Sequence, residues 1–199
     1  MIQVTHTPRP DAWVTTVAPE DAEGRLKEAY DWQAERLGAP TEFTQLGSLH
    51  PELVYERLRL YKTVEDVTSG LSETERLLVV YVTSVLNATP HCASGARVKL
   101  SVHGVDDDLV ARLAADPAEP ATGDRRLDTI LRYAATLTQS PGRVTAADID
   151  QLRAVGLDDA DIVALNDLTA YYNYVNRVAT GLGLRSEIPS EHALGAVPR

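Results

Sequence analysis

Apolar residues recur every three or four positions along most of the chain, which is the spacing of helices with one buried face. Proline and glycine residues punctuate this pattern where helices usually begin and end. The pattern predicts helices over residues 19–37, 42–46, 51–70, 72–86, 90–103, 106–115, 124–138, 145–155 and 158–181. No segment shows the alternation of a strand, so the expected fold class is all-α.

The two ends of the chain lack this period. Residues 1–18 are expected to form an extended N-terminal arm, 19–185 a helical domain and 186–199 a loose C-terminal tail. The stretch 116–123, with two prolines and a glycine, is the best internal linker. In each half a capped apolar helix follows a shorter one, so two remote helical repeats are an open alternative.

The helix predicted over 72–86 carries the clearest signals. Ser72 and Glu75 have the spacing of a capping box, in which each side chain accepts a hydrogen bond from the backbone N–H of the other residue. Residues 77–86 are apolar on almost every side. A helix of that kind normally lies at the centre of a core.

Composition and charge narrow the function classes. The 199 residues include 19 Lys and Arg against 29 Asp and Glu, and the net charge of −10 disfavours nucleic acid and anionic membranes as partners. The single cysteine, Cys92, excludes an internal disulfide, and no two histidines have ligand spacing with a carboxylate, so neither a metal nor a cofactor is expected. No membrane span or signal peptide is visible. These features predict a soluble, cytoplasmic protein whose partner is a small-molecule ligand or substrate.

The run Thr89-Pro90-His91-Cys92 places the cysteine in the first turn of a predicted helix. Thr89 suits the N-cap, where its hydroxyl would accept a hydrogen bond from the N–H of Cys92, and Pro90 suits the first helical position. The positive end of the helix would then favour the thiolate and lower the pKa of Cys92. The alternative is a buried, inert cysteine at a helix junction.

Several motifs stand in a specific order from residue 20 to residue 185. They are Leu49-His50-Pro51-Glu52, Leu71-Ser72-Glu73-Thr74-Glu75-Arg76, Val82-Thr83-Ser84, Asn87, Cys92, Ala170-Tyr171-Tyr172-Asn173-Tyr174-Val175-Asn176-Arg177 and Gly181-Leu182-Gly183. Together they resemble the AhpD-like or carboxymuconolactone decarboxylase superfamily, and within it the peroxidase-related, alkylhydroperoxidase-like subgroup. The resemblance implies an AhpD-like multihelical bundle that assembles as a homo-oligomer, either a dimer, a trimer or a hexamer.

The active site of that superfamily is a C-x-x-C pair at a helix start, with a glutamate one helix earlier and a histidine one turn later. The second cysteine attacks the peroxide, and the first resolves the sulfenic acid to a disulfide. By resemblance Cys92 matches the attacking cysteine. The resolving cysteine falls on Thr89, the histidine on Gly95 or Ala96, and the glutamate on Leu77. The site is therefore degenerate, and a disulfide cycle is impossible here.

Other polar side chains are expected near this site. Tyr81 and Ser84 share the helix face of Leu77, and hydroxyl groups over an apolar floor suit a small organic ligand, although Tyr81 also fits a core position. Asn173 and Arg177 either line the pocket or belong to a polar subunit interface. The catalytic candidates are Cys92, His91 and Tyr81, and the pocket candidates are Leu77, Ser84, Thr89, Ala96, His50, Asn173 and Arg177.

Three functions fit these observations. The first is a repurposed small-molecule enzyme that carries out isomerisation, decarboxylation or lactone chemistry. The second is a one-cysteine alkylhydroperoxide reductase that uses Cys92, although it lacks the acid–base partners that such a thiol needs. The third is a non-catalytic oligomeric binding protein with a vestigial pocket.

Overall fold

The computed structural model describes residues 12–188. This part of the chain folds into nine α-helices and two short 3-10 helices and contains no strand, which confirms the all-α prediction. The α-helices are α1 (Gly24–Leu37), α2 (Glu42–Gln45), α3 (Pro51–Asp66), α4 (Glu73–Leu86), α5 (Pro90–Val102), α6 (Asp107–Ala115), α7 (Arg125–Gln139), α8 (Ala146–Ala154) and α9 (Asp159–Gly181). The 3-10 helices are Pro19–Asp21 and Pro141–Arg143.

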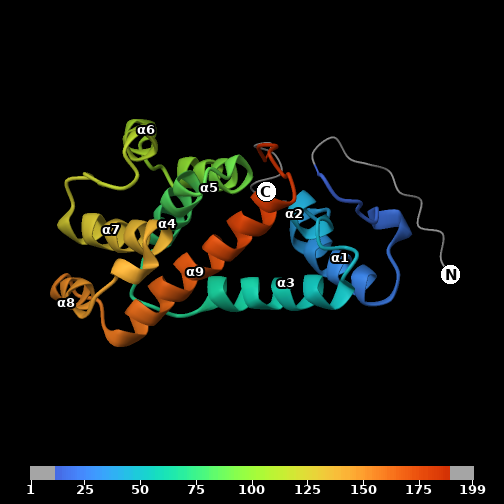
Figure 1. The fold of residues 1–199 in the computed structure, drawn as a ribbon, viewed down its shortest axis with the longest axis horizontal. Coiled ribbons are helices and arrows are strands. Elements are labelled where there is room, and N and C mark those ends of the chain that lie inside the picture. Colours follow the sequence, from blue (N-terminus) through green and yellow to red (C-terminus); the bar gives the residue numbers. More distant parts are fainter. Residues whose placement is uncertain (1–11, 189–199) are drawn as a thin grey trace.

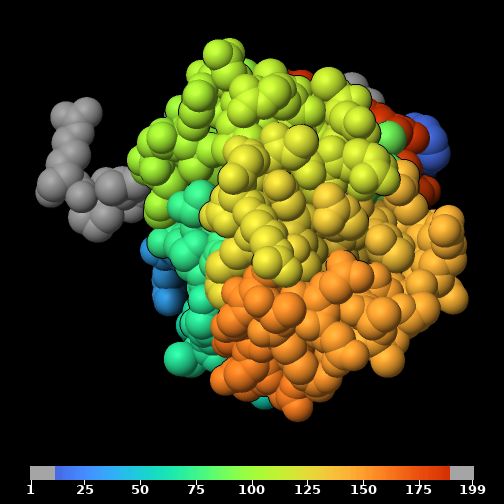
Figure 2. Space-filling view, turned by 90° about the vertical axis from the view of Figure 1, so that its left-hand side faces the viewer, coloured from blue at the N-terminus to red at the C-terminus, as the bar shows by residue number. Residues whose placement is uncertain are grey.

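The long helix α9 runs diagonally through the molecule, with α3 along one side of it and α4, α5 and α7 on the other (Figure 1). Helices α1 and α2 lie at one end, next to α3, and α8 lies at the opposite end. Figure 2 shows that opposite end as a closed surface formed by α7, α8 and the start of α9, with the α5–α6 region above them. Helix α4 packs against α5, α7 and α9 and is therefore the central element.

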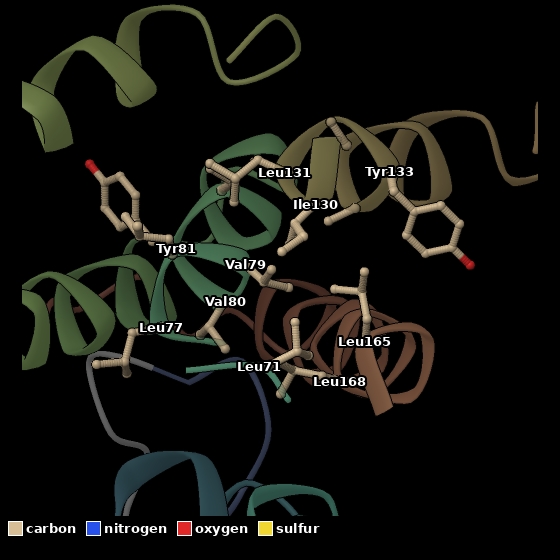
Figure 3. Packing of buried hydrophobic residues seen from close by; sticks show 14 of the residues in the cluster. Leu71, Leu77, Val79, Val80, Tyr81, Ile130, Leu131, Tyr133, Leu165 and Leu168 are labelled. Atoms are coloured by element: carbon tan, nitrogen blue, oxygen red, sulfur yellow. The ribbon is translucent and has the colours of Figure 1, made fainter. Parts of the chain in front are cut away.

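Helix α4 is central because it has no polar face. All eight residues from Leu77 to Ser84 are buried, and Val79 and Val82 have no exposed surface. Leu165 and Leu168 of α9 and Ile130 and Leu131 of α7 complete the core around it (Figure 3). The prediction of an apolar central helix is confirmed.

The helix boundaries follow the predicted capping signals closely. The capping box of Ser72 and Glu75 is present at the start of α4, with bonds of 2.7 and 3.2 Å. Capping boxes also open α8 at Thr145 and α9 at Asp158. Each one satisfies backbone N–H groups that a helix start leaves free.

Two predicted helices are shorter than expected. The segment 19–37 breaks after Asp21, because Ala22 and Glu23 are extended and the side chain of Ala22 is buried. The helix that was expected to reach Gly70 ends at Asp66. The guanidinium of Arg76 donates to the carbonyl oxygens of Val64 and Glu65 at 2.6 and 3.1 Å and so holds this end of α3.

The two ends of the described chain meet. The backbone N–H of Trp13 donates to the carbonyl oxygen of Leu182 at 2.8 Å, and the Trp13 ring lies against Gly183. The segment 183–188, called here the C-terminal segment, then runs along α5. Residues 186–188 therefore differ from the loose tail that was expected, because the body of the protein binds them. The rest of the predicted arm (1–11) and tail (189–199) lie outside the described residues.

No helix among residues 12–188 is long and apolar enough to cross a membrane. The proposed domain boundaries and the two remote repeats stay predictions.

Candidate functional site

The turn between α4 and α5 sets the position of Cys92. Ala88 takes a left-handed backbone conformation (φ 50°), which few non-glycine residues adopt and which makes the turn tight. The Thr89 hydroxyl donates to the carbonyl oxygen of Asn87 at 3.3 Å and lies 3.1 Å from the hydroxyl of Thr180. The prediction that Thr89 caps Cys92 is wrong, because α9 and the turn occupy its side chain.

Cys92 lies in the first turn of α5, as expected, and is half-buried against the apolar core. Burial raises the pKa of its thiol to about 12. The predicted lowering of this pKa is therefore wrong. The loss of solvation outweighs the positive end of the helix, because no cation or hydrogen-bond donor has been found to hold a negative charge there.

His91 is buried and turns away from the core side of α5. Its Nδ1 lies 3.2 Å from the carbonyl oxygen of Ser186, and the carboxylate of Glu42 is 3.9 Å away. Burial lowers the pKa of His91, while Glu42 and the Ser186 carbonyl act in the opposite direction. The contacts of His91 bind the C-terminal segment, and its catalytic role stays a prediction.

The C-terminal segment covers the next turn of α5. The backbone N–H of Ile188 donates to the Ser94 hydroxyl at 2.8 Å, and a Cβ added at Gly95 would meet the Ile188 side chain at 2.9 Å. Gly95 and Ala96 are the positions that match the superfamily's relay histidine by resemblance. Ala96 is buried, and the chain itself lies over Gly95.

Three of the predicted pocket residues belong to a polar joint between α4 and α9. The Ser84 hydroxyl donates to Asn176 Oδ1 at 3.3 Å, and both side chains are fully buried. The Asn173 amide accepts a hydrogen bond from Asn87 at 2.9 Å and donates to Thr138 of α7 at 3.0 Å. Arg177 is exposed and bonds to Asn173. This joint satisfies polar groups in an apolar interior, as buried polar groups require.

Leu77 and Tyr81 are buried on α4. In Figure 3 the Tyr81 ring lies at the edge of the core, and its hydroxyl points away from the leucines of α9. Burial raises the pKa of Tyr81, and the charge of Arg97 opposes this shift. Tyr81 therefore faces the α5 side, as the sequence indicated, with a neutral hydroxyl.

His50 is exposed at the start of α3 and lies far from these contacts in role. It lines a shallow surface hollow of about 460 Å³ together with Leu49, Pro51, Glu52 and Leu53. Its place in a pocket wall stays a prediction.

The sequence reasoning missed two residues near Cys92. Tyr172 of α9 donates from its hydroxyl to Glu65 Oε1 of α3 at 3.1 Å. Both side chains are half-buried, and the Cys92 thiol is close enough for its charge to affect Tyr172. The cluster of tyrosines at 171–174 was a visible signal, but nothing in the sequence joins it to a glutamate 107 positions away.

No group of three His, Cys, Asp or Glu side chains among residues 12–188 is arranged to hold a metal ion.

No family model matches the sequence, and no curated protein matches it. Solved structures match the fold over nearly the whole chain. An uncharacterised peroxidase-related protein from Ralstonia eutropha JMP134, described as an alkylhydroperoxidase AhpD core, superposes with a TM-score of 0.80 at 18% identity and covers 96% of this chain and 100% of its own. An uncharacterised peroxidase-related protein from Silicibacter sp. TM1040 gives 0.74 at 22% identity, covering 90% and 94%.

A third match has a characterised chemistry. The debrominase Bmp8, in complex with 2,3,4-tribromopyrrole, superposes with a TM-score of 0.71 at 13% identity and covers 95% of this chain and 97% of its own. The chain therefore has the AhpD-like, all-helical fold of peroxidase-related proteins.

Proposed function

We propose that this protein is a small-molecule enzyme of the AhpD-like superfamily that acts through one neutral thiol, Cys92, instead of the two-cysteine peroxide relay. The observation that carries the proposal is the state of that thiol. Cys92 occupies the position of the attacking cysteine by resemblance, yet burial raises its pKa to about 12, so it is protonated at neutral pH. A protonated thiol is a poor peroxide nucleophile.

The surroundings of Cys92 support the loss of the relay. Thr89 is bonded to the turn and to α9 and has no thiol with which to resolve a sulfenic acid. Leu77 is buried in the core where the relay glutamate would stand. The one-cysteine peroxidase alternative is disfavoured for the same reason, since the thiol lacks a cation that would hold it ionised.

The debrominase Bmp8 supports a small organic ligand. Its structure holds a brominated pyrrole, so one protein of this fold acts on a compact ring compound. For the present chain we infer a substrate of similar size. Isomerisation, decarboxylation and lactone chemistry are the reactions we consider, and a non-catalytic binding protein is the alternative.

The test compares hydroperoxide consumption and ligand turnover in one preparation. Purified protein is incubated with cumene hydroperoxide and excess dithiothreitol beside Cys92→Ser, and separately with small unsaturated acids and lactones followed by chromatography. We expect peroxide consumption equal to that of the Cys92→Ser control, and turnover of at least one organic compound that Cys92→Ser lacks. Cys92-dependent peroxide turnover would overturn the proposal. Organic turnover by neither protein would support the binding alternative.

We also propose that the protein assembles as a homo-oligomer. Helix α3 and its flanks carry an exposed apolar stripe of Leu49, Leu53, Leu60 and Val67, each at least 43% exposed. The spacing of four and seven residues places them on one side of the helix. A second copy of the chain is the expected occupant, as the resemblance implies. The cytoplasmic location stays a prediction.

A further inference from the structure

A second titratable cluster lies beside Cys92 and uses none of the relay positions. The Tyr172 hydroxyl of α9 donates to Glu65 Oε1 near the end of α3 at 3.1 Å. Tyr172, Tyr61 of α3 and Cys92 of α5 all pack against the same apolar core. Three helices therefore bring a phenol, a carboxylate and a thiol to one place.

Four ionisable groups face the Tyr172 hydroxyl, namely Tyr61 and Glu65 of α3, Cys92 of α5 and Tyr171 of α9. Burial first, and then the negative charge that each of these groups can carry, raises the pKa of Tyr172 well above its usual value. Tyr172 is therefore a neutral donor at neutral pH. Its proton already points at a carboxylate that can accept it.

We propose that Tyr172 and Glu65 form an acid–base pair for Cys92, and that the site adds the Cys92 thiol reversibly to an electron-poor carbon–carbon double bond of a small organic molecule. This inference rests on the function proposed above. It assigns the acid–base role that Leu77 and Ala96 cannot fill to residues from α3 and α9. A neutral thiol suits this addition because a base can take its proton as the bond forms.

The step balances without an outside oxidant or reductant. As the Cys92 sulfur bonds to the electron-poor carbon, its proton passes to the Tyr172 oxygen and the Tyr172 proton passes to Glu65. The π electron pair moves onto the neighbouring carbon, which then receives a proton back from Glu65 through Tyr172. The net change is addition of S–H across the double bond.

The reverse step restores the double bond and the thiol. Between the two steps the former double bond is single and can rotate, so addition followed by elimination exchanges the cis and trans forms of the ligand. Isomerisation by this route consumes no co-reactant. The ligand class is therefore a small alkene that is conjugated to a carbonyl or carboxylate.

The experiment measures the pH dependence of a stoichiometric reaction. N-Ethylmaleimide, a small neutral electron-poor alkene, reacts with the intact protein, and mass spectrometry follows modification of Cys92 between about pH 6 and pH 8. The wild-type rate is expected to change by less than about threefold per pH unit, because the pair takes the proton. Tyr172→Phe and Glu65→Gln are expected to follow the thiolate population and change about tenfold per pH unit.

Two matched variants serve as controls. Tyr174→Phe removes a hydroxyl two positions along α9 from a ring that is 40% exposed, and Glu56→Gln removes an exposed carboxylate of α3. Both are expected to keep the shallow wild-type profile. Circular dichroism of each variant at each pH confirms the fold, and Glu65→Gln, which preserves size and shape, decides the test if Tyr172→Phe unfolds.

The inference is overturned if the wild-type rate itself rises about tenfold per pH unit, or if Tyr172→Phe and Glu65→Gln run parallel to wild type. Neither outcome depends on turnover or on hydroperoxide. The assay therefore separates failure of the acid–base pair from failure of the proposed function.

Discussion

The side chain of Cys92 is under two opposing influences, the positive end of α5 and the apolar residues that surround it. The second dominates, and burial raises the thiol pKa to about 12. The helix end acts through partial charges of about half a unit, whereas burial removes most of the water that would solvate the thiolate. A cysteine at a helix start is therefore acidic only where solvent or a cation also reaches it.

A spectroscopic titration of the thiol tests this balance. The thiolate absorption at 240 nm, taken as the difference between wild type and Cys92→Ser, is expected to emerge only above about pH 10 in the folded protein. In concentrated urea the same difference should titrate near the value of a free cysteine, about 8.5. A folded-state signal that is complete by about pH 9 would contradict the inferred burial.

His91 shows the same cost of burial with the opposite charge. Its pKa is lowered in the folded protein by burial, while the unfolded chain has the ordinary value of about 6.5. Below that pH the unfolded chain takes up a proton that the folded protein resists, so folding stability falls as the pH drops. Above it both states hold His91 neutral, and the effect is absent.

The pH effect is measured by urea unfolding of wild type and His91→Gln. The free energy of unfolding of wild type is expected to decrease from pH 7.5 to pH 5.5 by more than that of His91→Gln. The difference between the two proteins isolates His91 from the other titrating groups. Equal slopes would show that the histidine is solvated in the folded state.

At the scale of elements, the C-terminal segment depends on one glycine. Gly183 has a φ of +89°, and a Cβ added there would lie 2.5 Å from the Trp13 ring. Gly123 has the same φ of +89°, but no atom of the described chain lies within 4 Å of an added Cβ. The pair separates the cost of the left-handed backbone from the cost of the clash.

Gly123→Ala is expected to lower the free energy of unfolding by about 1–2 kcal/mol, the cost of a left-handed residue with a side chain. Gly183→Ala is expected to lower it by about 2–5 kcal/mol, because overpacking adds to that cost. Denaturant unfolding measures both. Equal losses would mean that Trp13 moves aside freely.

The helices could be predicted from the sequence because their signals are local. Capping residues such as Ser72 and Asp158 and the apolar run of α4 specify where a helix begins and which face it buries. The site could be predicted only in part. Cys92 and its turn were found, but the Tyr172–Glu65 pair was not, because side chains from α3 and α9 meet only through packing.

Polar residues that suggested a pocket illustrate the same limit. Ser84 and Asn173 lie on an apolar helix face and beside a tyrosine cluster, where a ligand or a buried polar joint would need the same residue types. The joint is what the fold contains, since Ser84 pairs with Asn176 and Asn173 with Thr138. A sequence gives the donors and acceptors but not their partners.

At the scale of the whole molecule, one face of α3 is unusually apolar for a chain with a net charge of −10. Leu53 and Leu60 are each about half exposed in the single chain. Like-charged copies repel each other at long range, so an assembly needs an apolar contact to hold it together.

Sedimentation velocity of Leu60→Glu tests this surface. The variant is expected to sediment as a smaller species than wild type while its circular dichroism is unchanged, because a buried unpaired carboxylate is costly at an interface. Val163→Glu, which replaces an exposed apolar residue of α9, is the control and is expected to keep the wild-type size. A Leu60→Glu protein of wild-type size would place the subunit contact elsewhere.

The contact between Trp13 and Gly183 also gives the protein an internal optical reporter. The chain has two tryptophans, and Trp32 is set apart on α1, where its ring lies 5.9 Å from that of Tyr55. In a Trp32→Phe background the remaining indole lies on the C-terminal segment, with the guanidinium of Arg185 5.8 Å from its ring. Its emission would follow release of that segment from α5 in real time, so opening of the cover over Cys92 can be timed against ligand entry without any attached dye.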